Sequence, residues 1–300
     1  MGEIPVMTGA KPYLILAIGV ISVSFAAIFI RLAEAPPLVI ATYRLIIASA
    51  ILIPFNFVRS GWLPKRLSRS DVLLIILASM FIALHFALWI TSLSYTSIAS
   101  SVVIVTSHPL FVAIISYFLW RERLNKKAIL GIIIALGGVV LINYGGFLVS
   151  PRAIFGDLLA LLAAISMGVY LIIGRQLKGR INILPYLTMI YAGAALILLM
   201  VTVFSGYSLF NYTSTTYAML FLLALIPQLI GHSSLNLAVR LIPVTLVSVG
   251  ILGEPIIAVA LGYIILGEGI TITEILGSLL TLGGMFIVLR YRPKSDVIRL

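Results

Sequence analysis

Two titratable side chains lie in long apolar runs, and each is followed directly by a proline. His108-Pro109 is part of "TSHPLF" and Glu254-Pro255 is part of "LGEPII", with 146 positions between the two pairs. Proline inside a helix removes a backbone hydrogen bond, and an ionisable group at membrane depth is costly. Glu254 could carry a proton or bind an amine, and His108 could carry a proton or bind an anion. The structural alternative is that backbone groups freed at each helix break hold these side chains.

Helical spacing groups further polar side chains on two faces. They lie three or four residues apart in two apolar runs: His85, Trp89 and Ser92; Gln228, His232, Asn236 and Arg240. Because polar side chains avoid lipid, we expect both faces to point into the protein. There they either line a cavity or join helices by hydrogen bonds.

Arg44 is a cation inside an apolar run, about seven residues from its predicted outer end. It could extend to the surface, pair with Glu34 or contact a substrate carboxylate. Glu254 is the proton-coupling candidate. The full set of predicted cavity or substrate-binding residues is Trp89, His108, His232, Asn236, Glu254, His85 and Arg44.

The composition is that of an integral membrane protein. Of the 300 residues, 62% are hydrophobic and 10% are charged, whereas soluble domains are about 25% charged. The absence of cysteine excludes disulfides, a thiol nucleophile and cysteine-based metal sites. The three histidines show no metal-ligand spacing. We therefore predict no catalytic group, no metal and no cofactor.

Apolar runs of about 20 residues, the length that spans a bilayer as a helix, occur ten times. The fold class expected is an all-α integral membrane protein with ten transmembrane helices. Their expected ranges are 13–32, 37–58, 71–94, 98–120, 128–148, 157–174, 184–205, 215–239, 243–266 and 273–291.

The basic residues predict the orientation of these helices. Seventeen of the twenty Lys and Arg fall in connectors on one side, Arg31 and Arg152 fall on the other, and Arg44 lies within a span. The positive-inside rule then places both termini in the cytoplasm. It also explains the net charge of +11 without nucleic acid, which we do not expect as a partner.

The 146-residue step reveals an internal repeat. It also pairs Glu122 with Glu268 and several glycines, without a gap from 108 to 142. We predict two five-helix repeats, 1–148 and 150–300. Because five is odd, the copies enter the membrane from opposite sides, as in transporters that alternate access to a site between inverted repeats.

A stripe of small residues follows in each copy. Gly131, Ala135 and Gly138 are spaced i, i+4 and i+7, and so are Gly277, Thr281 and Gly284. Such stripes allow the backbones of membrane helices to approach closely. We predict that Gly131, Gly138, Gly277 and Gly284 serve helix packing, and that Pro109 and Pro255 break their helices.

Residues 95–142 and their second copy near 241–288 resemble the EamA-like ten-helix transporters of the drug/metabolite transporter superfamily. The mid-helix proline, the acidic turn at Glu122 or Glu268 and the paired glycines carry this resemblance. It implies transport of small metabolites through a central cavity between the halves. The first and sixth helices contain no mid-membrane acid, so the mechanism of the four-helix relatives in this superfamily does not transfer.

These observations predict a secondary transporter in the plasma membrane. It would move a small organic metabolite, an amino acid or related compound, most plausibly outward and coupled to protons through Glu254. Its partners would be the solute and the lipid bilayer, as a monomer or a homodimer. The alternatives are an intramembrane enzyme, a lipid-handling protein and a channel.

Overall fold

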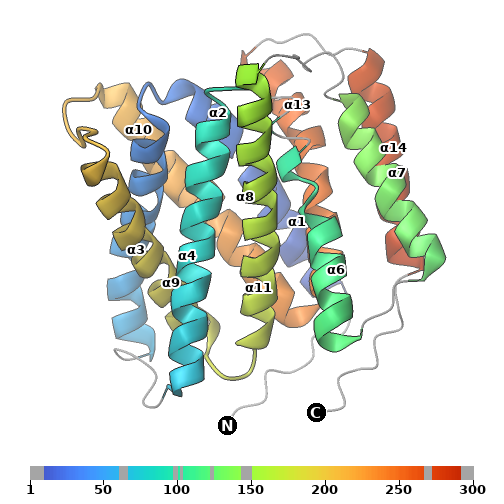
Figure 1. The fold of residues 1–300 in the computed structure, drawn as a ribbon, viewed down its shortest axis with the longest axis horizontal. Coiled ribbons are helices and arrows are strands. Elements are labelled where there is room, and N and C mark those ends of the chain that lie inside the picture. Colours follow the sequence, from blue (N-terminus) through green and yellow to red (C-terminus); the bar gives the residue numbers. More distant parts are fainter. Residues whose placement is uncertain are drawn as a thin grey trace.

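The computed structural model describes residues 10–60, 67–96, 101, 104–121, 125–142, 151–266 and 272–291. Within these ranges every regular element is a helix (Figure 1). The first half of the chain supplies α1 (Lys11–Ser24), α2 (Ala26–Leu32), α3 (Pro37–Ser60), α4 (Arg69–Ser92), α6 (His108–Trp120) and α7 (Lys126–Ile142). Glu122 and Glu268, on which part of the repeat was recognised, lie outside the described residues.

The second half of the chain begins with two long helices and continues with several interrupted ones. Its elements are α8 (Pro151–Gln176), α9 (Ile183–Phe204), α10 (Ser214–Leu223), the π-helical η2 (Ala224–His232), α11 (Ser233–Leu241), α12 (Val244–Gly250), the 3₁₀-helical η3 (Ile251–Gly253), α13 (Glu254–Leu266) and α14 (Ile272–Arg290).

Length and apolar composition make the protein a multi-pass membrane protein. In the described ranges, seven helical stretches are long and apolar enough to cross a bilayer. They are Lys11–Leu32, Pro37–Ser60, Arg69–Ser92, Pro151–Gln176, Ile183–Phe204, Ser214–Leu241 and Leu246–Ile265. Two shorter apolar helices are His108–Trp120 and Ile275–Val288. The count of ten spans stays a prediction, because parts of the expected helices 98–120 and 128–148 fall outside the described residues.

New helices begin at both of the paired titratable residues. Helix α6 begins at His108, and α13 begins at Glu254 directly after the η3 turn. Each proline is therefore the second residue of its helix, where no intrahelical hydrogen bond is lost and its fixed φ suits the first turn. The backbone cost expected for a mid-helix proline is thereby reduced.

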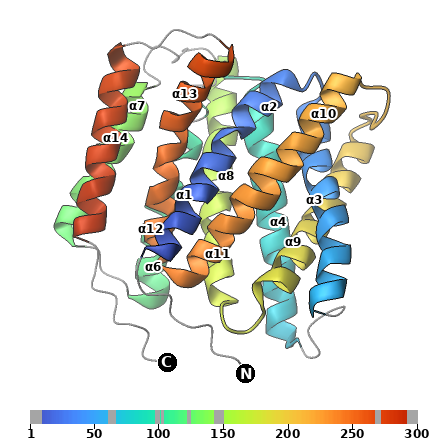
Figure 2. The same cartoon turned by 180° about the vertical axis from the view of Figure 1, so that it is seen from behind.

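Helices from the two halves of the chain pack against one another. Helix α4 packs on α8 and α9, α3 packs on α9, and α1 packs on η2 and α11. Helices α7 and α14 form a close pair at one edge of the molecule (Figures 1 and 2). Helix α1 begins and α14 ends at the same end of the bundle, the lower end in both views.

Two connectors meet at this lower end. The side chain of Ser68 accepts a hydrogen bond from the Asp71 backbone and caps α4. Arg180, in the turn between α8 and α9, approaches the same Asp71 carboxylate at 3.2 Å. A partly exposed ion pair of this kind contributes little stability. The ion pair shows instead that two connectors lie next to each other, and both are predicted to be in the cytoplasm.

The interface between α7 and α14 is built on the predicted glycine stripe. A Cβ added at Gly138 would lie 2.5 Å from the Gly277 carbonyl oxygen, and one added at Gly284 would lie 2.5 Å from that of Gly131. Between them, the Thr281 hydroxyl donates a hydrogen bond of 2.9 Å to the Gly277 carbonyl in its own helix. The backbones approach so closely that a larger side chain does not fit without a shift. This geometry suits the predicted role of these glycines in helix packing, which the following substitution tests.

Replacing Gly138 with alanine should therefore destabilise the protein, because the methyl group collides with backbone of α14. Overpacking of this kind costs about 1–3 kcal/mol. Thermal unfolding in detergent measures the loss. The matched control is Gly137→Ala, since a Cβ at Gly137 has nothing within 4 Å. Equal midpoints for the two variants would contradict the interface.

Candidate functional site

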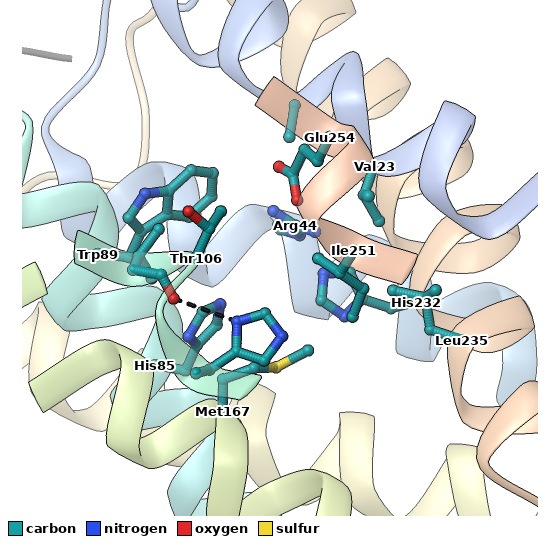
Figure 3. A pocket seen from close by; sticks show the side chains of 13 residues that line it. Val23, Arg44, His85, Trp89, Thr106, Met167, His232, Leu235, Ile251 and Glu254 are labelled. Atoms are coloured by element: carbon teal, nitrogen blue, oxygen red, sulfur yellow. Dashed lines mark hydrogen bonds between the residues drawn. The ribbon is translucent and has the colours of Figure 1, made fainter. Parts of the chain in front are cut away.

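One cavity inside the bundle brings together six of the seven predicted site residues. It has a volume of about 40 Å³. Arg44 comes from α3, His85 and Trp89 from α4, His108 from α6, His232 from η2 and Glu254 from α13 (Figure 3). The lining is completed by Val23, Ala26, Val105, Thr106, Met167, Leu235 and Ile251. Both halves of the chain thus contribute to one buried polar space.

Arg44 is the most deeply buried charge of this site, with 0% of its surface exposed. Its Nε donates a hydrogen bond of 2.7 Å to Oε1 of Gln228. Its guanidinium lies over the ring of Phe86, 4.0 Å from the centroid. Among the residues that the structure describes, Nη1 and Nη2 have no hydrogen-bond partner. Arg44 therefore does not extend to the surface, where Glu34 is exposed.

Glu254 faces Arg44 within the cavity. Its carboxylate points toward the guanidinium in Figure 3, and the two groups interact electrostatically. No ion pair within 4 Å joins these two described side chains. Coulomb attraction is strong in a medium of low dielectric constant, so an ionised Glu254 stabilises the charge of Arg44 across the gap.

The two histidines beside them have defined tautomers. Nδ1 of His85 lies 3.0 Å from the Ala163 carbonyl, and Nδ1 of His108 lies 3.2 Å from the Val105 carbonyl. A carbonyl only accepts, so Nδ1 carries the proton and Nε2 is the acceptor in each neutral ring. The His85 ring stacks on Trp89 with 6.1 Å between centroids. In the part of the chain that the structure describes, no three His, Asp or Glu residues are placed to hold a metal.

Gln228 owes its position to a helical irregularity that the sequence pattern did not reveal. The expected α-helical face of Gln228, His232, Asn236 and Arg240 begins in a π-helix, Ala224–His232, with Pro227 inside it. Proline cannot donate a backbone hydrogen bond, and a widened turn accommodates its ring. Single π-helical turns inside α-helices frequently mark functional sites. Here the distortion includes the residue that holds Arg44.

Asn236 is the one predicted site residue outside the cavity lining. It is buried, and its Nδ2 donates a hydrogen bond of 2.7 Å to the His232 carbonyl. It lies beside a group of fully buried tyrosines: Tyr170 from α8, Tyr186 and Tyr191 from α9. The sequence analysis did not predict these three tyrosines as site residues, because a tyrosine ring is common in any apolar core. Phe86, under Arg44, escaped notice for the same reason.

Positive charge gathers where α11 ends against the turn between α8 and α9. Arg240 donates to the Ile181 carbonyl and lies 4.7 Å from the Tyr186 ring centroid. Burial lowers the pKa of Lys178 in this turn, and the nearby charges of Arg175 and Arg240 lower the pKa further. The buried tyrosines and Arg240 therefore lie close to the basic turn between α8 and α9.

Removing the support of Arg44 gives a stability prediction. Gln228→Leu should lower the free energy of unfolding by about 2 kcal/mol, because a hydrogen bond to a buried charged group is lost without a substitute. Chemical or thermal unfolding of the purified protein measures the change. Gln176→Leu, a half-buried position at the end of α8, is the matched control. A Gln228 variant as stable as this control would mean that the hydrogen bond contributes nothing.

Comparison with known proteins reveals relatives and a common fold. The chain is 24% identical over 295 residues to the uncharacterized transporter YetK of Bacillus subtilis (strain 168), covering 96% of this chain and 89% of YetK. It is 24% identical over 283 residues to an uncharacterized transporter of Archaeoglobus fulgidus, covering 93% of this chain and 97% of the relative. A protein solved by crystallography superposes with a TM-score of 0.81 at 19% identity, over 95% of this chain and 99% of that one. This last likeness shows the fold alone.

The family model described as the EamA-like transporter family matches twice, at residues 10–144 and at residues 154–290. The two matches together cover most of the chain. They include every residue that lines the cavity. The protein is a member of the EamA-like transporter family.

Proposed function

We propose that the protein is a secondary transporter that exports a small organic metabolite, an amino acid or related compound, across the plasma membrane by alternating access. One observation carries the proposal: the buried Arg44 and the half-buried Glu254 face each other in a cavity lined by both halves of the chain. Buried charges in membrane proteins are costly and typically mark substrate or ion pathways.

Two inverted repeats would provide the moving parts. The family model matches each half of the chain separately, which supports repeats 1–148 and 150–300. Helices at equivalent positions of these repeats, α3 with α9 and α7 with α14, pack against each other. An axis of pseudo-symmetry in the membrane plane brings equivalent elements together in this way. Ten helices with both termini in the cytoplasm agree with α1 beginning and α14 ending at one end of the bundle.

The size of the cavity favours alternating access over an open channel. Its volume of about 40 Å³ has room for only a few water molecules, since one water needs roughly 10–15 Å³ of such space. A metabolite therefore enters only if the halves move apart. The buried tyrosines and Arg240 on one side of the cavity would form the seal that opens toward the cytoplasm.

Glu254 would couple transport to protons. When it is ionised, Glu254 compensates the buried positive charge of Arg44, which it faces in the cavity. Protonation of Glu254 would leave Arg44 without a compensating charge and so would change the relative stability of conformations. A group whose proton changes the balance between two states links solute movement to a proton gradient.

Flux measurements test the transport activity and its coupling. Reconstituted protein should move at least one solute of an amino acid and metabolite panel, and a pH gradient should accelerate that flux. Glu254→Gln should retain flux but lose the acceleration, because the proton carrier is gone. The exposed acid Glu34 supplies the control Glu34→Gln, which should behave as the wild type. Absence of flux for every solute would overturn the transporter assignment, and acceleration in Glu254→Gln would remove that residue's role.

Cysteine labelling tests orientation and alternation, and the chain has no native cysteine to interfere. With a membrane-impermeant thiol reagent, Ser214→Cys should react from the outside alone and Asn182→Cys from the cytoplasmic side alone. Thr106→Cys in the cavity should react from both sides, because the site opens to each in turn. Ser49→Cys, buried in α3 away from the cavity, is the unreactive control. Labelling of Thr106→Cys from one side alone would contradict alternation.

A further inference from the structure

The two terminal nitrogens of Arg44 are the strongest unexplained feature of the cavity. They are buried, they carry a positive charge, and they have no hydrogen-bond partner among the described residues. Arginine keeps its proton under nearly all conditions in proteins, so this charge cannot be relieved by titration. Two buried nitrogens of a cation without hydrogen bonds are costly even where Glu254 faces the charge, and a ligand that accepts from them would supply the missing hydrogen bonds.

We propose that Arg44 is the anchor for the carboxylate group of the transported solute, which it binds through Nη1 and Nη2. This inference rests on the proposed function, since it takes the cavity as the solute site. A guanidinium presents parallel N–H bonds along its edges, with the spacing of the two oxygens of a carboxylate. Gln228 occupies Nε at 2.7 Å, so the edge formed by Nη1 and Nη2 remains for the solute.

Gln228 and Phe86 are positioning residues for this edge. The hydrogen bond from Nε fixes the direction of the guanidinium, and the Phe86 ring 4.0 Å away covers its face. Phe86 is in turn held by an edge contact with His232, 5.2 Å between centroids. A cation fixed in this way loses little further conformational freedom when it binds an anion, which strengthens binding.

The charges of the site favour a monovalent carboxylate over a phosphate. The lining of the cavity contains one arginine and one acid, Glu254. A dianionic phosphate would outweigh the single positive charge and would repel the Glu254 carboxylate. A monocarboxylate is balanced by Arg44, and a positive group elsewhere on the same solute would be balanced by Glu254.

Binding of small probes to the purified full-length protein tests the anchor without any need for transport. Sodium propionate, propionamide, propylamine hydrochloride and sodium phosphate are compared at equal ionic strength by thermal unfolding. Propionate at saturating concentration should raise the midpoint by about 3 °C, because a ligand that binds only the folded state stabilises it. Propionamide has the same shape without the charge, and it should leave the midpoint unchanged.

Variants at two arginines of α3 test whether the rise in the unfolding midpoint with propionate depends on Arg44. Arg44→Gln should abolish the shift caused by propionate. Arg59→Gln should keep it, since Arg59 lies exposed near the end of the same helix. Equal shifts with propionate and propionamide, or no shift with any probe, would overturn the proposal. A shift that survives in Arg44→Gln would do the same. A shift with phosphate or propylamine in place of propionate would assign a different ligand class to the cavity.

Gln228→Glu keeps the test decisive if Arg44→Gln does not fold. This nearly isosteric change places a carboxylate beside Nε of Arg44, where it keeps the hydrogen bond and neutralises the guanidinium. It should also abolish the shift with propionate, because the internal carboxylate replaces the external one. A full propionate shift in this variant would contradict the proposal. Flux of any solute in parallel measurements would then show that the transport function stands while the anchor does not.

Discussion

The free-energy cost of a buried guanidinium is the constraint on which the arrangement of the site depends. Arg44 has no exposed surface, and its charge lies inside a bundle whose helices are among the most apolar that proteins use. Such a charge is tolerated when hydrogen bonds, an aromatic face and an opposite charge surround it. Gln228, Phe86 and Glu254 supply these three, and each comes from a different element of the fold.

Irregular backbone near the cavity supplies part of this environment. Gln228 lies in a π-helix, Glu254 begins α13 after a 3₁₀ turn, and His108 begins α6. Non-helical backbone at membrane depth is tolerated where it lines a polar space or is buried in protein. Pro109 and Pro255 are compatible with the breaks at His108 and Glu254, because a proline in the first turn of a helix loses no hydrogen bond. Pro227 instead lies inside the π-helix that contains Gln228.

The helix pair at one edge of the molecule and the helices around the cavity differ in their packing. Helices α7 and α14 approach through glycines with almost no side chain between them. The helices around the cavity carry aromatic and polar side chains instead. A glycine interface holds two helices together through van der Waals contact, and here the Thr281 hydroxyl adds a hydrogen bond of 3.3 Å to the Ala135 carbonyl of α7. The chain thus separates a purely structural helix pair from the helices that hold the polar site.

Composition and local pattern determined the membrane class and the family, and they singled out most of the polar side chains that the structure brings into one cavity. In an apolar run, each polar or charged residue is easily singled out as a candidate site residue, because all of its neighbours are apolar. That signal found Arg44, His85, His108, His232 and Glu254, which the structure brings into one cavity. The glycine stripes could also be recognised from the sequence, because small residues at this spacing in membrane helices typically indicate close helix packing.

Tertiary structure alone decided which polar side chains meet and which partners they use. Asn236 shares a helical spacing with His232, yet it bonds to the His232 carbonyl and lies outside the cavity lining. The π-helix altered the face on which Gln228 lies, and the pairing of Gln228 with Arg44 joins residues 184 positions apart. Phe86 and the buried tyrosines carry no sequence signal, since an aromatic ring in an apolar helix is ordinary core. Contacts between distant helices depend on packing of the whole bundle, which periodicity along a single helix does not encode.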